Sequence, residues 1–298
     1  MIKPSRLNPG DSIGIVSPAG PVDRSHLAAG LHFLKTKGFK VQVGPHVYDR
    51  REYLAGKDED RLSDLHHMFR NAEIKAVFCS RGGYGSLRLL DRIDFDLIRK
   101  NPKIIVGYSD ITALLTAIFE KTGLVTFHGP MVKGVSSLPE KSWRNLLRII
   151  SSEQPAVFSP MEGYPLSGGK GTGPIMGGNL SLICRLVGTP FMPSLRGSIL
   201  FVEDRGEALY RLDRMFTHLV LSGSLEGIKG LIVGQFIDCG DPAAVDHLIK
   251  ERFAPMNIPI ATGFPLGHGP ENTTLPLGIV AELDTDAMTL SLLEPTVL

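Results

Sequence analysis

Cysteine is scarce in this 298-residue chain, which contains only Cys79, Cys184 and Cys239. The three are widely separated, odd in number and without a CxxC pair, which argues against a disulfide framework and against a zinc site. We therefore expect three reduced cysteines in the core and no bound metal.

An excess of charge of one sign is also missing, because 32 Lys and Arg residues oppose 31 Asp and Glu residues. A net charge of +1 creates no field that would draw the protein to nucleic acid or an anionic membrane. No apolar run approaches the ~18 residues that a spanning helix needs, and the N-terminal residues do not resemble a signal peptide. We expect a cytoplasmic protein with a small partner and with no nucleic-acid or membrane partner.

The residues that are present predict two α/β domains. Up to about residue 135, short β-branched runs alternate with amphipathic stretches, which is typical of a doubly wound parallel sheet. Residues 1–150 are therefore expected to form one domain. A segment rich in Gly, Pro and Ser makes 151–175 a linker, and 176–298 are expected to form a smaller mixed α/β domain. The expected strands in the first domain are Ser12–Ser17, Phe39–Val43, Ala76–Ser80, Lys103–Gly107 and Leu124–His128.

Helices are expected between these strands and in the second half. Periodicity and stop signals predict helices over Asp23–Lys37, Asp58–Asn71, Asp110–Lys121, Glu140–Ser151, Asn179–Val187, Glu207–Leu221 and Ala243–Phe253. Strands are expected over Ser198–Val202 and Gly230–Phe236 and near Ile258 and Ile279. Periodicity does not predict the order of strands in the second sheet.

Ser109 lies in the most informative segment, where a buried-type strand runs through Gly107-Tyr-Ser-Asp directly into an amphipathic helix. This pattern is typical of a nucleophile elbow, in which the serine hydroxyl is exposed above the carboxyl edge of a sheet. Ile111 stands where the G-x-S-x-G pattern has its second glycine. The alternative is that Ser109 or Asp110 only caps the helix.

Another turn at the same sheet edge follows the strand that ends at Ser80, in the sequence Arg81-Gly-Gly-Tyr-Gly. An N–H group of Gly82 or Gly83 could join that of Asp110 as an oxyanion hole. Phosphate binding and a turn without a ligand are the alternatives. A nucleotide-binding loop is not expected, because no Lys-Ser/Thr follows the glycines.

A serine nucleophile requires a base and a group that orients it. Of nine histidines, His268 stands out because it lies in a glycine-rich loop after an apolar strand. Glu203 ends another apolar strand and is the best candidate for the orienting acid, with Asp204 as an alternative. His128 ends a strand at the carboxyl edge and is a candidate for lining the site, whereas His46 lies in a polar loop with no evident partner.

Seven motifs in order resemble the LD-carboxypeptidase family of serine peptidases over nearly the whole chain. They are Pro9-Gly-Asp-Ser-Ile-Gly-Ile-Val-Ser-Pro-Ala-Gly, Ser80-Arg-Gly-Gly-Tyr-Gly, Gly107-Tyr-Ser-Asp, Phe127-His-Gly-Pro, Gly177-Gly-Asn-Leu, Val202-Glu-Asp and Gly267-His-Gly. The resemblance implies a Rossmann-like first domain and a smaller α/β second domain with the site between them. It also implies that Ser109 is the nucleophile and that Glu203 and His268 complete a triad.

The function implied by the resemblance is hydrolysis of the bond between an L-configured centre, at lysine or meso-diaminopimelate, and the terminal D-Ala of a murein tetrapeptide. The partner is then a murein-derived peptide in cell-wall recycling, with no metal or organic cofactor and with a homodimer in keeping with the family. Arg81, Tyr84 and His128 are candidates for substrate binding. The alternatives are a microcin C-type hydrolase of peptidyl or aminoacyl nucleotides, and a non-catalytic protein that binds a small ligand.

Overall fold

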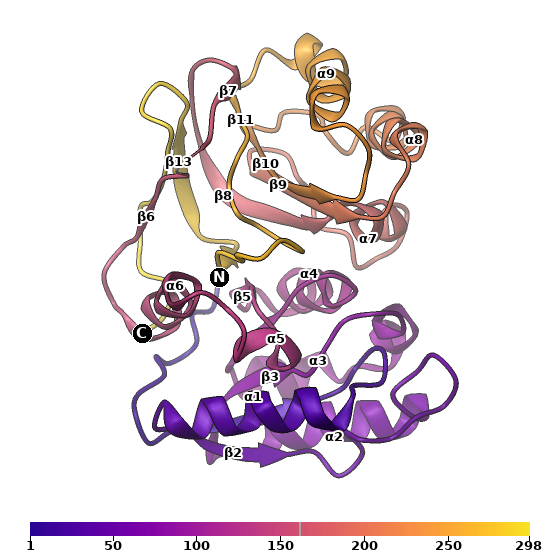
Figure 1. Cartoon of the computed structure of the whole chain (residues 1–298), viewed down its shortest axis with the longest axis vertical. Helices are drawn as coiled ribbons and strands as arrows, with labels where there is room; N and C mark the ends of the chain where they lie inside the picture. Colours follow the sequence, from indigo (N-terminus) through magenta and orange to yellow (C-terminus); the bar gives the residue numbers. More distant parts are fainter. Residues whose placement is uncertain (161) are drawn as a thin grey trace.

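Two α/β lobes make up the computed structural model, which describes residues 1–160 and 162–298 (Figure 1). The N-terminal lobe contains β1 (Ser12–Val16), α1 (Arg24–Thr36), β2 (Lys40–Val43), α2 (Asp58–Arg70), β3 (Ile74–Cys79), η1 (Ser86–Arg92), α3 (Phe95–Lys100), β4 (Ile104–Gly107), α4 (Ile111–Thr122), β5 (Thr126–His128), α5 (Val132–Val135) and α6 (Glu140–Ser151).

The sheet of the N-terminal lobe has the order β12-β5-β4-β3-β1-β2, and its strands from β5 to β2 are parallel. This confirms the doubly wound parallel sheet that was expected from the sequence. Helix α1 begins where the side chain of Asp23 accepts hydrogen bonds from the N–H groups of Ser25 and His26. Helix α4 ends at Gly123, whose φ of 72° supplies the left-handed residue that stops a helix.

The C-terminal lobe is built on a mixed sheet of eight strands, in the order β6-β14-β13-β8-β9-β10-β11-β7. Its strands β8, β9, β10 and β11 are mutually parallel, and the others are antiparallel to their neighbours. The elements are β6 (Val157–Phe158), β7 (Pro165–Ser167), β8 (Lys170–Asn179), α7 (Leu180–Leu186), β9 (Ile199–Arg205), α8 (Leu209–Leu221), β10 (Gly230–Ile237), α9 (Pro242–Phe253), η2 (Ala254–Met256), β11 (Ile260–Ala261), β12 (Leu275–Leu277), β13 (Val280–Asp284) and β14 (Thr289–Leu292).

Two features differ from the expected domain boundaries. Residues 151–175, expected to be a linker, contain β6, β7 and the first part of β8, all of which belong to the C-terminal sheet. Strand β12, from the second half of the chain, pairs antiparallel with β5 and so extends the N-terminal sheet. Burial of Leu275 and Leu277 accounts for this crossover, since both side chains are completely buried.

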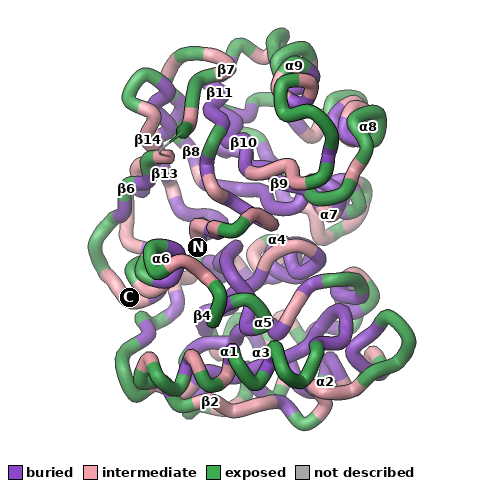
Figure 2. The backbone as a smooth tube through the Cα atoms, viewed as in Figure 1, coloured by how far each residue is buried: buried purple, intermediate pink, exposed green. Residues whose placement is uncertain are grey.

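In the described structure, one of the two clusters of buried apolar side chains spans both lobes, and the other lies within the C-terminal lobe. One cluster of buried apolar side chains includes Val106 and Phe127 from the first lobe together with Phe201 and Leu275 from the second, and buried backbone fills both lobes and their junction (Figure 2). All three cysteines are buried and free, as expected. Among the described residues, no helix is both long enough and apolar enough to cross a membrane.

Candidate active site

Ser109 lies in the turn between β4 and α4 and has a left-handed backbone, with φ of 62°. A non-glycine residue in this region carries strain of about 1–3 kcal/mol, which is found preferentially at functional sites. Gly107 is required before the turn, because a Cβ there would lie 2.6 Å from the side chain of Ile111. The segment therefore has the geometry of a nucleophile elbow, with a buried Ile111 in place of the second glycine.

Asp110 does not cap α4, since its side chain makes no capping hydrogen bond. Its Oδ2 instead accepts a hydrogen bond of 2.9 Å from the Ser86 N–H, and its carbonyl accepts one of 2.6 Å from Ser86 Oγ. Burial raises the pKa of the Asp110 carboxyl, against the opposing effect of these hydrogen bonds. Helix capping, the alternative interpretation of this aspartate, is therefore wrong, and Asp110 joins the elbow to the glycine-rich loop.

The glycine-rich loop lies directly against the elbow. A Cβ on Gly82 would lie 2.9 Å from Ser109 Cβ and 3.4 Å from the Asp110 nitrogen, so no larger residue fits there. In the described parts of the chain, no backbone acceptor pairs with the N–H groups of Gly82, Gly83 or Asp110. The buried guanidinium of Arg61 holds the far end of the loop by donating to the carbonyl of Gly85 at 3.0 Å.

Glu203, His268 and Ser109 form one line of contacts across the junction of the lobes. The Nδ1 atom of His268 lies 2.7 Å from Glu203 Oε2, and its Nε2 lies 3.1 Å from Ser109 Oγ. Gly267, with φ of 100°, permits this approach because a Cβ on it would lie 2.1 Å from Glu203 Oε2. The structure thus brings together the three residues that the sequence predicted, with the carboxylate and the hydroxyl on opposite ring nitrogens.

Asp204 points away from His268. Its Oδ1 accepts a hydrogen bond of 3.0 Å from Asn179 Nδ2, and its Oδ2 accepts one of 2.9 Å from the Ser181 N–H. Neighbouring side chains of a strand point to opposite faces, which separates Asp204 from Glu203. Of the two carboxylates left open by the sequence, only Glu203 contacts the histidine.

The Glu203 carboxylate is completely buried beside two imidazoles. Burial raises its pKa, but the His128 and His268 side chains favour the charged form more strongly, so the pKa lies below the usual range. His128 Nε2 lies 3.8 Å from Glu203 Oε1. Neither His128 ring nitrogen nor this oxygen has a hydrogen-bond partner among the described residues.

The three candidate substrate-binding residues lie in different places. His128 is 0% exposed and lies behind Glu203, so the expectation that it lines the site is wrong, because its ring packs against Phe201 and Tyr108. Tyr84 is exposed and packs edge-on against Tyr53. Arg81 lines a cavity of about 180 Å³ and donates a hydrogen bond of 2.8 Å to the Pro21 carbonyl.

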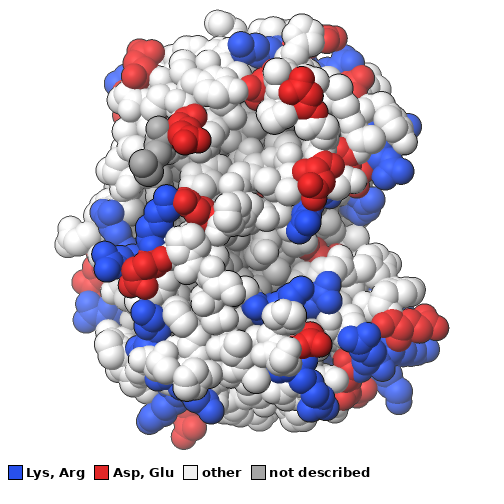
Figure 3. All heavy atoms as spheres, viewed as in Figure 1, with Lys and Arg blue, Asp and Glu red and all other residues white. Residues whose placement is uncertain are grey.

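Lys133 and Asn272 are polar residues of this cavity that were not predicted from the sequence. Both follow motifs that had been noticed, Phe127-His-Gly-Pro and Gly267-His-Gly, but neither stands at a strand end. A second cavity, of about 690 Å³, is lined by Gln235 and Pro270 among others. The face seen in Figure 3 is hollowed between the lobes.

His46 has the carboxylate partners that the sequence did not predict. Its Nδ1 lies 2.8 Å from Asp64 Oδ1, and this hydrogen bond raises the pKa of the imidazole. Asp49 and Asp60 lie near its other side, and one ligand atom from each of these two and from His46 fall within 4.8 Å of one another. This cluster belongs to the N-terminal lobe and has no contact with the triad residues.

A serine at a strained strand-to-helix turn, in line with an imidazole and a buried carboxylate, places the chain in the class of serine peptidases and related hydrolases. The LD-carboxypeptidase N-terminal domain model matches residues 13–129, and the LD-carboxypeptidase C-terminal domain model matches residues 172–283. The protein belongs to the LD-carboxypeptidase family.

Relatives in this family carry two kinds of name. The probable murein peptide carboxypeptidase of Bacillus subtilis is 40% identical over 95% of this chain and 92% of its own. The microcin C7 self-immunity protein MccF of Escherichia coli is 30% identical, over 96% of this chain and 94% of its own. The crystal structure of an MccF-like protein from Bacillus anthracis superposes with a TM-score of 0.94, at 29% identity, and covers 99% of this chain and 100% of its own.

Proposed function

We propose that this protein is a serine carboxypeptidase that hydrolyses the bond between an L-configured centre and the terminal D-Ala of a murein tetrapeptide. The observation that carries the proposal is the line of contacts from Glu203 Oε2 through His268 to Ser109 Oγ. The similarity to the murein peptide carboxypeptidase of Bacillus subtilis supports this choice of substrate.

The first half of the proposed reaction forms an acyl-enzyme. Nε2 of His268 takes the proton from Ser109 Oγ as this oxygen attacks the peptide carbonyl carbon. The N–H of Asp110 and an N–H of Gly82 or Gly83 stabilise the oxyanion, which is consistent with the absence of backbone acceptors for these groups. When the C–N bond breaks, His268 gives its proton to the leaving amine and D-Ala departs.

The second half is hydrolysis by water. His268 takes a proton from the water as its oxygen attacks the ester carbonyl, and then returns that proton to Ser109 Oγ. Glu203 holds the tautomer with its proton on Nδ1 and stabilises the imidazolium in both halves. The lowered pKa of Glu203 suits this role, because the carboxylate stays ionised at neutral pH.

Incubation with L-Ala-γ-D-Glu-meso-diaminopimelyl-D-Ala, followed by mass analysis, tests the proposal directly. We expect loss of one alanine residue and release of free D-Ala. An unchanged tetrapeptide, at enzyme concentrations that suffice for an authentic family member, would contradict the proposed substrate.

A second candidate is hydrolysis of aminoacyl or peptidyl nucleotides by the same three residues. The observation that favours it is the TM-score of 0.94 to an MccF-like protein. An aminoacyl sulfamoyl adenosine should be tested beside the tetrapeptide at equal concentration. A higher kcat/KM for the nucleotide conjugate would favour this candidate over the murein peptidase.

We expect Glu203→Gln to lower kcat less severely than His268→Ala, because the glutamate orients the base and does not transfer the proton itself. Steady-state kinetics of the two variants on the tetrapeptide checks the order. Combining His268→Ala with Ser109→Ala should add little further loss, since the residues act as a unit. Losses that multiply as independent effects would contradict the triad.

His128 is proposed as a positioning residue for Glu203. In His128→Leu the pKa of Glu203 should rise, because the carboxylate loses a neighbouring imidazole that favours its charged form. We expect kcat at neutral pH to fall by about tenfold with little change in KM, and the loss in kcat/KM relative to wild type to grow as the pH falls, because a protonated Glu203 no longer stabilises the His268 imidazolium. His128→Gln, which keeps a polar side chain beside Glu203 Oε1, should retain more activity, whereas an equal loss at every pH would indicate packing alone.

A further inference from the structure

The cavity of about 180 Å³ lies on the His268 side of the candidate active site. Gly267 and Gly269, which flank His268, both line it. Tyr108, the residue before Ser109, lines it as well, and the Tyr108 ring meets the His268 ring edge-on with centroids 5.0 Å apart. Chain neighbours of both the proposed base and the proposed nucleophile therefore line the cavity.

The leaving group of a serine peptidase must lie beside its histidine, because the imidazole has to protonate the departing amine. For a carboxypeptidase, the leaving group is a single amino acid that carries a free carboxylate. A cavity that borders His268 is thus where that amino acid should bind. Its volume is sufficient for a small residue such as alanine.

In the part of the chain that the structure describes, two cationic side chains without a carboxylate partner and one unpaired amide group line this cavity. Arg81 and Lys133 line it, and within the described residues neither cation has a carboxylate within 4.0 Å. Asn272 also lines it and is 3% exposed, and its Oδ1 accepts a hydrogen bond of 3.3 Å from the Gly267 N–H. The Asn272 Nδ2 is buried without a partner in the described structure, an arrangement that is costly unless a ligand supplies the acceptor.

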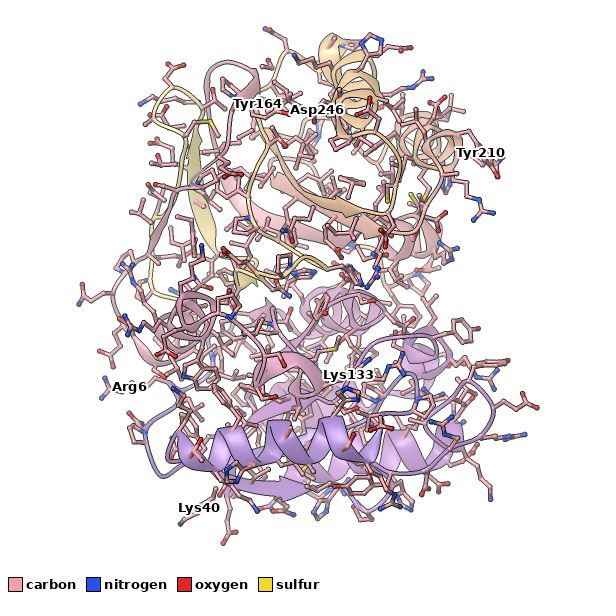
Figure 4. The ribbon with its side chains drawn as sticks, viewed as in Figure 1. Arg6, Lys40, Lys133, Tyr164, Tyr210 and Asp246 are labelled. Carbon is pink, nitrogen blue, oxygen red and sulfur yellow. The ribbon has the colours of Figure 1, made fainter. Side chains whose placement is uncertain are left out.

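A hydrogen bond fixes the backbone of Lys133. It lies at the start of α5 (Val132–Val135), and its N–H donates a hydrogen bond of 2.9 Å to the Ser80 carbonyl at the end of β3. Figure 4 shows Lys133 on the N-terminal lobe near α5, below the junction with the C-terminal lobe, whereas Lys40 lies at the opposite edge of the N-terminal lobe. The Lys133 side chain thus extends from an ordered element that lines the cavity.

We propose that this cavity binds the leaving amino acid, with Lys133, Asn272 and Arg81 forming the subsite for its terminal carboxylate. A carboxylate can accept hydrogen bonds from both cations and from the unpaired Asn272 amide group. The assignment rests on the proposed carboxypeptidase function. It adds the residues that would restrict cleavage to the C-terminal bond of a peptide. Lys133 provides the clearest test, because Arg81 also holds the Pro21 carbonyl.

The kinetic experiment compares wild type, Lys133→Gln and the control Lys40→Ala on the tetrapeptide and on its C-terminal amide. For the free acid, we expect Lys133→Gln to lower kcat/KM by about tenfold to a hundredfold, since a hydrogen bond to a charged partner is lost. For the amide, which already lacks the carboxylate, Lys133→Gln should change kcat/KM by less than about twofold. Equal losses on both substrates, or no loss on either, would overturn the proposal.

A binding experiment separates failure of this subsite from failure of the proposed function. N-acetyl-D-alanine carries the terminal carboxylate and D-centre, and its binding can be followed by ligand-observed NMR without any cleavage. We expect N-acetyl-D-alanine to bind wild type and Lys40→Ala with similar affinity, and to bind Lys133→Gln at least about tenfold more weakly. N-acetyl-D-alanine amide, which lacks the carboxylate, should bind wild type at least about tenfold more weakly than the free acid does. If this binding pattern is found but the tetrapeptide is not cleaved, the carboxylate subsite stands and the murein peptidase function is rejected. If N-acetyl-D-alanine binds all three proteins equally, the subsite is rejected.

Discussion

Replacement of Ser109 by alanine is expected to abolish release of D-Ala from the tetrapeptide, with kcat lowered by about 10⁴-fold to 10⁶-fold. The physical reason is that no other hydroxyl lies in line with His268 Nε2, which is 3.1 Å from Ser109 Oγ, among the contacts of the described residues. Single-turnover and steady-state assays of purified Ser109→Ala check the result. Retention of more than about one per cent of wild-type kcat would remove Ser109 from its proposed role.

The fold should survive this change. Ser109 is only partly buried, and alanine keeps the left-handed backbone at φ of 62° at a similar cost, so thermal unfolding should shift little. A serine-reactive phosphonate should label wild type and the control variant Ser137→Ala, in which an exposed serine is lost, but not Ser109→Ala. Absence of labelling in wild type would favour a non-catalytic binding protein.

The second large effect concerns the chain end of the substrate. We expect a tetrapeptide ending in D-Ala to be cleaved, and a pentapeptide ending in D-Ala-D-Ala to resist cleavage of its last bond. The tetrapeptide ending in L-Ala should also lose at least about a hundredfold in kcat/KM, because a site shaped for the D-centre is left with misplaced and unpaired groups. Mass analysis of the three peptides after equal incubation measures these differences.

One outcome would withdraw the murein tetrapeptide proposal. Efficient release of the last D-Ala from the pentapeptide would indicate a DD-carboxypeptidase. A bond between two D-centres requires the acyl side of the site to accept a D-residue, which is the opposite of the proposed preference. The amino acid that binds in the cavity beside His268 would be the same in both cases, so this test examines the acyl side of the site.

Features set by neighbouring residues could be predicted from the sequence. Helix α6 has the predicted bounds, and each end of α4 lies within one residue of the predicted Asp110–Lys121. Short helices such as α3 and α5 were missed, because segments of four to six residues span less than two turns and are too short to show a helical period. The strands within residues 151–175 were missed for a related reason, since their Gly-rich and Pro-rich composition is also typical of a linker.

The sequence by itself determined that a serine follows a buried strand at the start of a helix, and that a glutamate follows the apolar run of a second strand, although β9 continues two residues beyond it, to Arg205. These properties depend on periodicity over a few residues, which local steric and hydrophobic effects govern. Only the tertiary structure decided that Glu203 and not Asp204 contacts His268, that His128 lies behind the carboxylate, and that Lys133 and Asn272 share a cavity. Those outcomes depend on how two sheets pack and on which face each strand presents, and contacts between residues far apart in the chain determine both.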